Sequence, residues 1–388
     1  MSRFRIKIKK ANVKLGIIHS KLVEYPQHLL MAQLHALTRA KNLLRTEILK
    51  TNPHSINNWS KLLNWRRLTQ VKNVPPSQAS LALGVIGLGQ AWALYLPGIG
   101  EIIRPYLAAF GALLLLPVLL RYLTSFNTFI NDIRHPLSGS LMAPMSMALL
   151  ILCDYLAEIS PIIAYPIWFC ALFLHFTMMV LFFGFQIINF KMSNIVPSWF
   201  LYPVGLISSS LAGTQFGHTV FSETLAATCI AIYFFMLPVV LYRLVFEGNL
   251  PRRARPTLAI MAAPVNLSLA AYLVNFDNPD PILTGALAGI AITMTLLIYL
   301  CYIRLMRLKF QPSIAAVTFP SVISAIAMHR LTTFFGAEFP QWYWLHKFGF
   351  FELTIATILV IWVAGGYVKM YWPEFFDPDY MSKKVKRS

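Results

Sequence analysis

The sequence has few charged residues, and acidic residues are the scarcest of them. Only 12% of its 388 residues are charged, 33 of them basic and 15 acidic, whereas a soluble globular domain has about 25%. The mean hydropathy is +0.60. This composition excludes a soluble globular protein. Apolar runs of about twenty residues recur from about residue 77 to about residue 370, and runs of that length predict membrane-spanning helices.

Cysteine and clustered polar residues are also rare. The four cysteines, at positions 153, 170, 229 and 301, stand alone and match no metal or redox spacing, which argues against a disulfide framework. The histidines are scattered, and we interpret His175, alone on an apolar span, as a packing residue. A membrane enzyme would need His, Asp, Glu or Cys residues clustered near an interface. We therefore predict a protein that is not an enzyme and has no metal and no cofactor.

Charge sorts the connections between ten predicted spans. Acidic residues such as Asp154 and Asp277 lie on one side, whereas Arg252–Arg255, Arg304 and the C-terminal tail lie on the other. An excess of Lys and Arg marks the cytoplasmic side. We expect a multi-pass protein of the plasma (inner) membrane with both termini in the cytoplasm. The predicted spans are residues 77–96, 102–125, 139–157, 162–189, 197–215, 221–247, 256–275, 282–308, 312–335 and 344–370.

The first 74 residues form a basic extension, with 15 Lys and Arg against two Glu. They show no apolar block and cleavage site of a signal peptide. Three interpretations remain open: a solvated tail, a segment lying on anionic lipid headgroups, or an arm that docks a partner. Nucleic acid is not an expected partner, because the extension is attached to a membrane domain. We divide the chain into a cytoplasmic extension at 1–73, partly helical or membrane-surface, a ten-helix domain at 74–370 and a short basic tail at 371–388.

A pair of prolines recurs in alternate spans. The prolines are eight residues apart in HPLSGSLMAP, RPTLAIMAAP and QPSIAAVTFP and six apart in VPSWFLYP, and PSQASLALG has Gly84 in place of the second proline. The leading prolines, at 76, 136, 197, 256 and 312, recur about every 60 residues, which is enough for two spanning helices and their turns. Self-similarity at a fixed period marks a repeated structural unit. We therefore predict five consecutive helical hairpins.

The two helices of each predicted hairpin differ in composition. Odd-numbered spans are rich in small and hydroxyl residues, whereas even-numbered spans are bulky, as in WFCALFLHFTMMVLFFGFQ. Small residues let helix backbones approach closely, and bulky apolar residues suit lipid. The predicted fold class is thus an all-α membrane protein. Its ten transmembrane helices form five hairpins in a quasi-fivefold ring around a central pore, which the odd-numbered helices line.

The second prolines, Pro144, Pro203, Pro264 and Pro320, fall at one height on the inner helices. A proline inside a helix removes a backbone hydrogen bond and kinks the helix, so we expect a narrow waist with exposed backbone dipoles. Packing kinks, which are common in membrane helices, are the alternative. No Asp or Glu lies in the middle of an inner span. The Ser, Thr, Asn and backbone N–H groups there can donate hydrogen bonds to an anion, although hydroxyls also bond to their own helix.

Five motifs carry a family resemblance: VPPSQASLALGVIGLG, HPLSGSLMAP, NIVPSWFLYPVG, RPTLAIMAAPVN and AAVTFPSV. In their order and spacing, residues 74–370 resemble the tellurite-resistance/dicarboxylate transporter family, which includes bacterial tellurite-resistance proteins and plant slow anion channels. The resemblance implies a homotrimer and a phenylalanine on the ninth helix whose ring closes the pore. Phe319 stands at that position, with Thr318 in place of the family's serine. Gly84 matches the pore glycine of the first helix.

The proline pairs assign the remaining pore positions. Ala143 and Ala263 precede their prolines as Phe319 precedes Pro320, and they leave room on the axis for one ring. Tyr202 departs from these small residues, and we expect it to narrow the waist further. The predicted pore-lining residues are Gly84, Ala143, Pro144, Tyr202, Pro203, Ala263, Pro264, Thr318 and Pro320, with Phe319 as the gate.

The expected function is transport of small anions through this gated pore. The candidates are chloride or nitrate, a C4-dicarboxylate such as malate, and sulfite; tellurite resistance, in the family's name, need not be the native role. Two alternatives stay open. One is an integral membrane enzyme that acts on a lipid-linked substrate, and the other is a non-conducting membrane sensor whose basic arm signals to a partner.

Overall fold

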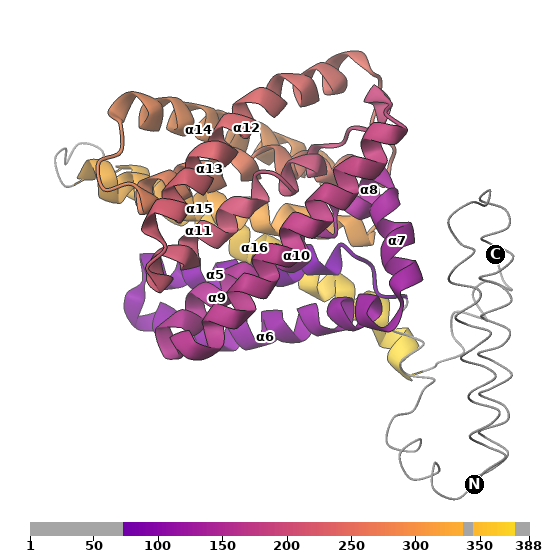
Figure 1. The fold of residues 1–388 in the computed structure, drawn as a ribbon, viewed down its shortest axis with the longest axis horizontal. Coiled ribbons are helices and arrows are strands. Elements are labelled where there is room, and N and C mark those ends of the chain that lie inside the picture. Colours follow the sequence, from indigo (N-terminus) through magenta and orange to yellow (C-terminus); the bar gives the residue numbers. More distant parts are fainter. Residues whose placement is uncertain (1–72, 337–343, 377–388) are drawn as a thin grey trace, which may run out of the picture. The chain divides into compact units, whose positions relative to one another are not determined.

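The computed structural model of the protein describes residues 73–336 and 344–376 (Figure 1). The expected extension at 1–73 and tail at 371–388 lie outside the described residues, except for residues 73 and 371–376. Within these ranges every regular element is helical. The α-helices are α5 (Gln78–Tyr95), α6 (Pro97–Thr124), α7 (Phe126–Arg134), α8 (Pro136–Ser140), α9 (Ala143–Ile159), α10 (Pro161–Ile188), α11 (Ser208–Gly213), α12 (Thr219–Phe246), α13 (Ala263–Asn275), α14 (Pro281–Leu305), α15 (Thr318–Gly336) and α16 (Trp344–Phe376). The 3₁₀ helices are η2 (Met192–Asn194), η3 (Pro197–Leu201), η4 (Gly205–Ile207), η5 (Thr214–Phe216), η6 (Arg255–Met261) and η7 (Pro312–Val317).

Eight segments in the described part of the chain are long and apolar enough to cross a membrane. The prediction of a helical membrane protein is therefore confirmed, but the count of ten spanning helices is not. The first expected span, α5, has 18 residues, and Gln78, Gln90 and its glycines lower its hydropathy. The fifth, at 197–215, is a succession of the short pieces η3, η4, α11 and η5.

Burial alternates along the chain as the composition predicts. Of the most apolar 18 residues in each span, 72% are buried in segment 136–159, 83% in 255–275 and 89% in 312–335. The buried share is only 22–39% in α6, α10, α12, α14 and α16. We call the latter five the outer helices. The inner elements are α5, α8–α9, the pieces from η3 to η5, η6–α13 and η7–α15.

The inner elements pack against one another in sequence order. α5 packs on α9, α9 on α11, α11 on α13, and α13 on α15, which returns to α5. Each outer helix packs on the inner element of its own hairpin; for example, α6 packs on α5, and α10 on α9. In Figure 1 most of these helices run along the long axis of the view or obliquely to it. The small residues of the inner spans let the backbones of the inner elements approach one another closely.

Proline marks where outer helices begin. Pro97, Pro161 and Pro281 are the first residues of α6, α10 and α14. At this position the missing N–H has no partner within the helix anyway, and the fixed backbone angle of proline suits the first turn. In α14 the preceding residue adds a cap, because the Asp280 carboxylate accepts a 2.8 Å hydrogen bond from the Leu283 N–H.

The tight turn between α5 and α6 gives a test of this packing. A methyl group added at Gly100 would overlap backbone atoms of Ala93, whereas one added at Gly98, in the same turn of α6, would meet nothing within 4 Å. We expect Gly100→Ala to lower the free energy of unfolding by about 1–3 kcal/mol, because the backbone must shift. The melting temperature of the detergent-solubilised protein measures this loss. Gly98→Ala is the matched control, and equal melting temperatures for the two variants would contradict the packing described.

Candidate functional site

The second proline of each pair lies near the junction of two helical pieces of an inner element. Pro264 is the second residue of α13, after η6, and Pro320 is the third residue of α15, after η7. Pro144 is the second residue of α9, and Pro203 lies between η3 and η4. The second proline thus lies near the start of an α-helix or, at Pro203, of a further 3₁₀ piece, and the kinks expected at these positions stay a prediction. Gly84, by contrast, lies within the uninterrupted α5.

Phe319 is buried between α15 and α5, and glycines make the room for it. A Cβ atom at Gly84 would lie 2.6 Å from Cβ and Oγ1 of Thr318, and one at Gly87 would lie 3.9 Å from the Phe319 ring. The Thr318 hydroxyl lies 2.9 Å from the carbonyl oxygen of Ser80 in α5 and bonds to it. The structure therefore brings Gly84, Thr318 and Phe319 together, and their roles in a pore stay a prediction.

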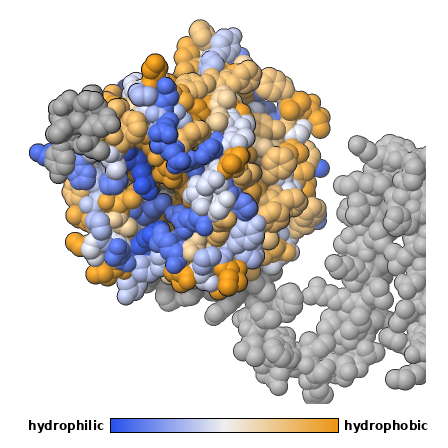
Figure 2. Space-filling view, turned by 60° about the vertical axis from the view of Figure 1, so that its left-hand side comes forward, coloured by the Kyte–Doolittle hydropathy of each residue, from blue (hydrophilic) through white to orange (hydrophobic). Residues whose placement is uncertain are grey.

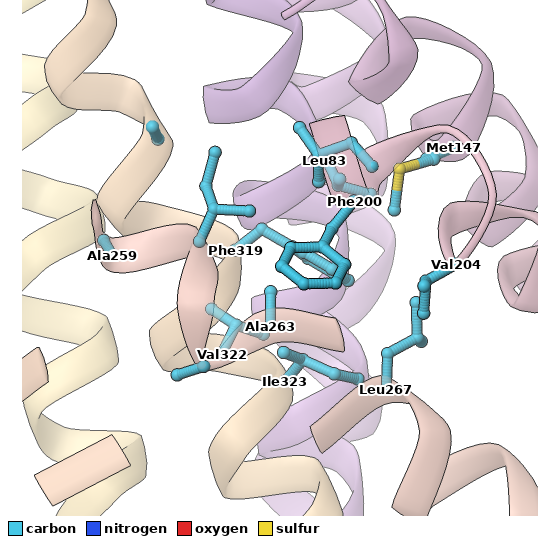
Figure 3. Packing of buried hydrophobic residues seen from close by; sticks show 14 of the residues in the cluster. Leu83, Met147, Phe200, Val204, Ala259, Ala263, Leu267, Phe319, Val322 and Ile323 are labelled. Atoms are coloured by element: carbon cyan, nitrogen blue, oxygen red, sulfur yellow. The ribbon is translucent and has the colours of Figure 1, made fainter. Parts of the chain in front are cut away.

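Side chains from each inner element surround this ring. Figure 3 shows the rings of Phe319 and Phe200 within one cluster of small and aliphatic side chains, all of them buried. Its labelled members come from α5 (Leu83), α9 (Met147), η3 and the following turn (Phe200, Val204), η6 and α13 (Ala259, Ala263, Leu267) and α15 (Phe319, Val322, Ile323).

Phe200 is the residue that sequence reasoning missed. Its side chain is fully buried, and its ring centroid lies 5.7 Å from that of Tyr233 in the outer helix α12. The sequence gives little signal for it, because Trp199, Leu201 and Tyr202 beside it are bulky as well, whereas Phe319 follows a run of small residues. The proline pairs compare only the residues directly before each second proline, and Phe200 lies three residues before Pro203.

Tyr202 faces the outer helix α10, which corrects the expectation that it narrows a waist beside Phe319. Its ring centroid lies 4.9 Å from that of Phe182, and its hydroxyl donates a 2.8 Å hydrogen bond to the Gly139 carbonyl. The imidazole of His175, also in α10, lies 2.8 Å from the Tyr202 carbonyl oxygen and 2.8 Å from the Ser146 hydroxyl. His175 is therefore a buried link between an outer helix and two inner elements.

The two predicted alanines, Ala143 at the start of α9 and Ala263 at the start of α13, are both buried and belong to the same hydrophobic cluster. Figure 3 labels Ala263 and, one turn beyond Ala143 in α9, Met147.

Buried hydroxyl groups of the inner elements fall into two sets. Many bond to their own element, as Ser209 bonds to the Leu206 carbonyl and Ser324 to the Ser321 carbonyl. Others have no hydrogen-bond partner among the described residues. These are the hydroxyls of Ser80 in α5, Ser208 in α11, Ser268 in α13 and Ser313 in η7. Such groups are able to donate to a solute.

A polar cavity of about 530 Å³ opens at the end where α5 is followed by α6. Figure 2 shows this face, with hydrophilic residues gathered around a hollow. Arg104 lies 3.7 Å from the Asp154 carboxylate and 2.7 Å from that of Glu158. Gln90 and Gln215 donate to the two oxygens of Asp154 at 3.0 and 2.6 Å. Arg330 of α15 lines the same cavity. We call this cavity the vestibule.

Fold and site together define a class: a helical membrane protein whose inner elements, most of them built from shorter helical pieces, meet around a buried apolar cluster. A family model described as "Voltage-dependent anion channel" matches residues 73–368. The chain belongs to this family, in agreement with the resemblance in its motifs.

Two relatives from Methanocaldococcus jannaschii carry only general names. One, an uncharacterized transporter, is 25% identical over 272 residues, which cover 62% of this chain and 79% of the relative. A second uncharacterized transporter is 24% identical over 328 residues, covering 74% of this chain and 93% of the relative. Family and relatives point to a channel or transporter and not to an enzyme.

The orientation of Tyr202 leads to a stability prediction. Tyr202→Phe removes the hydroxyl that bonds to Gly139, and we expect it to lower the free energy of unfolding by about 1 kcal/mol. Tyr242→Phe, in which the exposed tyrosine of α12 changes in the same way, should leave stability unaltered. Melting temperatures of the two purified variants check the difference. A Tyr202→Phe protein as stable as the control would show that this hydroxyl does not bind Gly139.

Proposed function

We propose that the protein conducts small anions through a pore that runs between the five inner elements, with Phe319 as its gate. The observation that carries this proposal is the cluster around Phe319, to which every inner element contributes a side chain. The cyclic order in which α5, α9, α11, α13 and α15 pack supports a quasi-fivefold ring around a central axis. Membership of the anion-channel family supports the solute class.

The physical mechanism is a dehydration barrier at the ring. A phenyl group offers no hydrogen-bond donor, so an anion at the height of Phe319 loses hydration without replacement. The unpartnered hydroxyls of Ser80, Ser208 and Ser268 are donors able to replace part of the hydration shell on the inner elements. Selectivity would then follow the cost of removing water from each anion.

The proposed solutes are the small anions that the family resemblance implies. Chloride, nitrate, sulfite and a C4-dicarboxylate such as malate are the candidates, and an ion-substitution series on reconstituted protein orders them. We further propose a homotrimer in the cell membrane with both termini in the cytoplasm. The basic connections, among them Arg252–Arg255, support this orientation.

Removal of the Phe319 ring tests the gate. We expect Phe319→Ala to raise anion flux into protein-loaded liposomes by about tenfold or more, since each 1.4 kcal/mol removed from a barrier is a factor of ten in rate. Phe319→Leu, which retains an apolar side chain, should fall between the wild type and the alanine variant. Flux of a radiolabelled or fluorescence-reported anion and the melting temperature are measured on the same preparations.

The matched control for this experiment is Phe235→Ala. Phe235 is 77% exposed on the outer helix α12, so its loss should change neither flux nor folding. A buried phenylalanine that only packs would lose about 3–5 kcal/mol of stability on truncation, with no gain in flux. That outcome for Phe319→Ala would overturn the gate.

Cysteine labelling tests the orientation. In a variant whose four native cysteines are replaced, Asp277→Cys should react with a membrane-impermeant reagent on intact cells. Arg253→Cys should react only after permeabilisation. Both positions are exposed, and the single inner element η6–α13 separates them. Labelling of both from the same side would show that η6–α13 does not cross the membrane.

A further inference from the structure

A second cavity, of about 480 Å³, lies at the opposite end of the helices from the vestibule. It is formed by the C-terminal ends of the outer helices α12 and α14 and by the start of η6, and α12 and α14 lie on the same side of the molecule in Figure 1. Three arginines line it, and none of its lining residues is acidic. We call it the basic pocket. The arginines are Arg243, Arg255 and Arg304.

Arg243 is the most unusual of the three, because its side chain is only 2% exposed. Its two terminal nitrogens donate to the carbonyl oxygens of Gly248 at 3.1 Å and Ser193 at 3.2 Å. Gly248 has a φ of +77°, a left-handed conformation that suits glycine in the turn after α12. The Nε of Arg243 has no partner among the described residues. A buried guanidinium is thus held by neutral groups alone.

No carboxylate of the described residues neutralises this charge. The ion pairs of the described part of the chain involve Arg104 and Arg121, and none involves an arginine of the basic pocket. Glu247 follows α12 directly but does not line the pocket. Arg255 donates through Nε to the Leu250 carbonyl at 3.4 Å, again a neutral acceptor. Arg255 and Arg304 are exposed, whereas the Arg243 guanidinium is buried. A buried charge without a counter-charge is costly, so the pocket favours an anionic ligand.

The rest of the pocket and its surroundings are apolar. Leu244, Leu258 and Leu305 line it between the arginines. Next to it on the outer helices, Phe246 and Ile303 are 69% and 58% exposed, as expected for side chains in contact with lipid. A ligand here would meet positive charge at one end and hydrocarbon along its length. That combination of charge and hydrocarbon matches an anionic phospholipid. The basic pocket is thus a different site from the proposed pore between the inner elements.

We propose that the basic pocket binds the phosphate headgroup of an anionic phospholipid from the leaflet that this end of the helices faces. Guanidinium groups match the geometry of phosphate oxygens and bind them by paired, charge-assisted hydrogen bonds. The acyl chains lie along the exposed apolar sides of α12 and α14. Since η6 continues into α13, which carries Ala263, the lipid braces one inner element against two outer helices.

The test measures lipid affinity of the purified full-length protein in detergent by native mass spectrometry. Phosphatidylglycerol should bind more tightly than phosphatidylcholine and should raise the melting temperature. The double variant Arg255→Gln/Arg304→Gln keeps the buried Arg243 and should fold. We expect it to weaken phosphatidylglycerol binding about tenfold or more, which corresponds to about 1.4 kcal/mol.

Two further arms separate this site from its alternatives. Arg253→Gln/Arg307→Gln removes two exposed arginines that do not line the pocket, and it should leave the affinity little changed. An equal loss in both double variants would assign the effect to the general charge of this end and overturn the pocket. Inorganic phosphate that stabilises the protein as well as phosphatidylglycerol does would identify a site for free anions. Equal binding of the two lipids would overturn any headgroup site.

Discussion

The hydrocarbon of a membrane offers no hydrogen-bond partner, so every backbone group freed by an interrupted helix must find one within the protein. The inner elements are interrupted at their prolines, and side chains supply those partners. His175 of α10 reaches the Tyr202 carbonyl, and the Tyr302 hydroxyl of α14 lies 3.3 Å from the Val317 carbonyl. Interrupted segments are therefore confined to the interior, and unbroken outer helices must surround them.

Close approach of the inner elements follows from the same constraint. The Gly84–Thr318 contact leaves no space for a Cβ atom, and a Cβ at Gly205 would lie 2.7 Å from the sulfur of Met147 and 3.2 Å from the His175 ring. Small residues at these contacts let backbones meet, and the volume that remains between them accommodates the rings of Phe200 and Phe319. A narrow apolar centre thus results from how the interrupted segments pack, before any function is considered.

Much of the hairpin arrangement could be predicted because its signals are local. Proline positions and the alternation of small with bulky spans act within one helix, and the predicted spans lie close to the observed elements. The direction of individual side chains was harder to predict where regular periodicity fails. Residues 197–207 form two 3₁₀ pieces joined by a turn. Counting residues back from Pro203 therefore predicts that Tyr202 lies beside Phe319, whereas its ring faces α10. The same count gives no reason to single out Phe200. The change from a 3₁₀ helix to an α-helix at Pro264 and Pro320 is not visible in the sequence either, because a proline is typical both of a bend within a helix and of a helix start.

The two ends of the membrane domain differ in whether their charged side chains are paired with opposite charges. In the vestibule, Arg104 is paired with Asp154 and Glu158, and two glutamine side chains donate to Asp154. Arg104, Asp154 and Glu158 are thus neutralised largely within the protein, and Glu101 and Arg330 add one charge of each sign to the lining. At the other end the arginines of the basic pocket have only carbonyl partners or none among the described residues. An unneutralised positive potential attracts anionic groups from solution and from lipid alike, and its range is about 8–10 Å at physiological salt. The asymmetry therefore supports both proposals, since anionic solutes and anionic headgroups are each attracted more strongly to the basic end than to the vestibule.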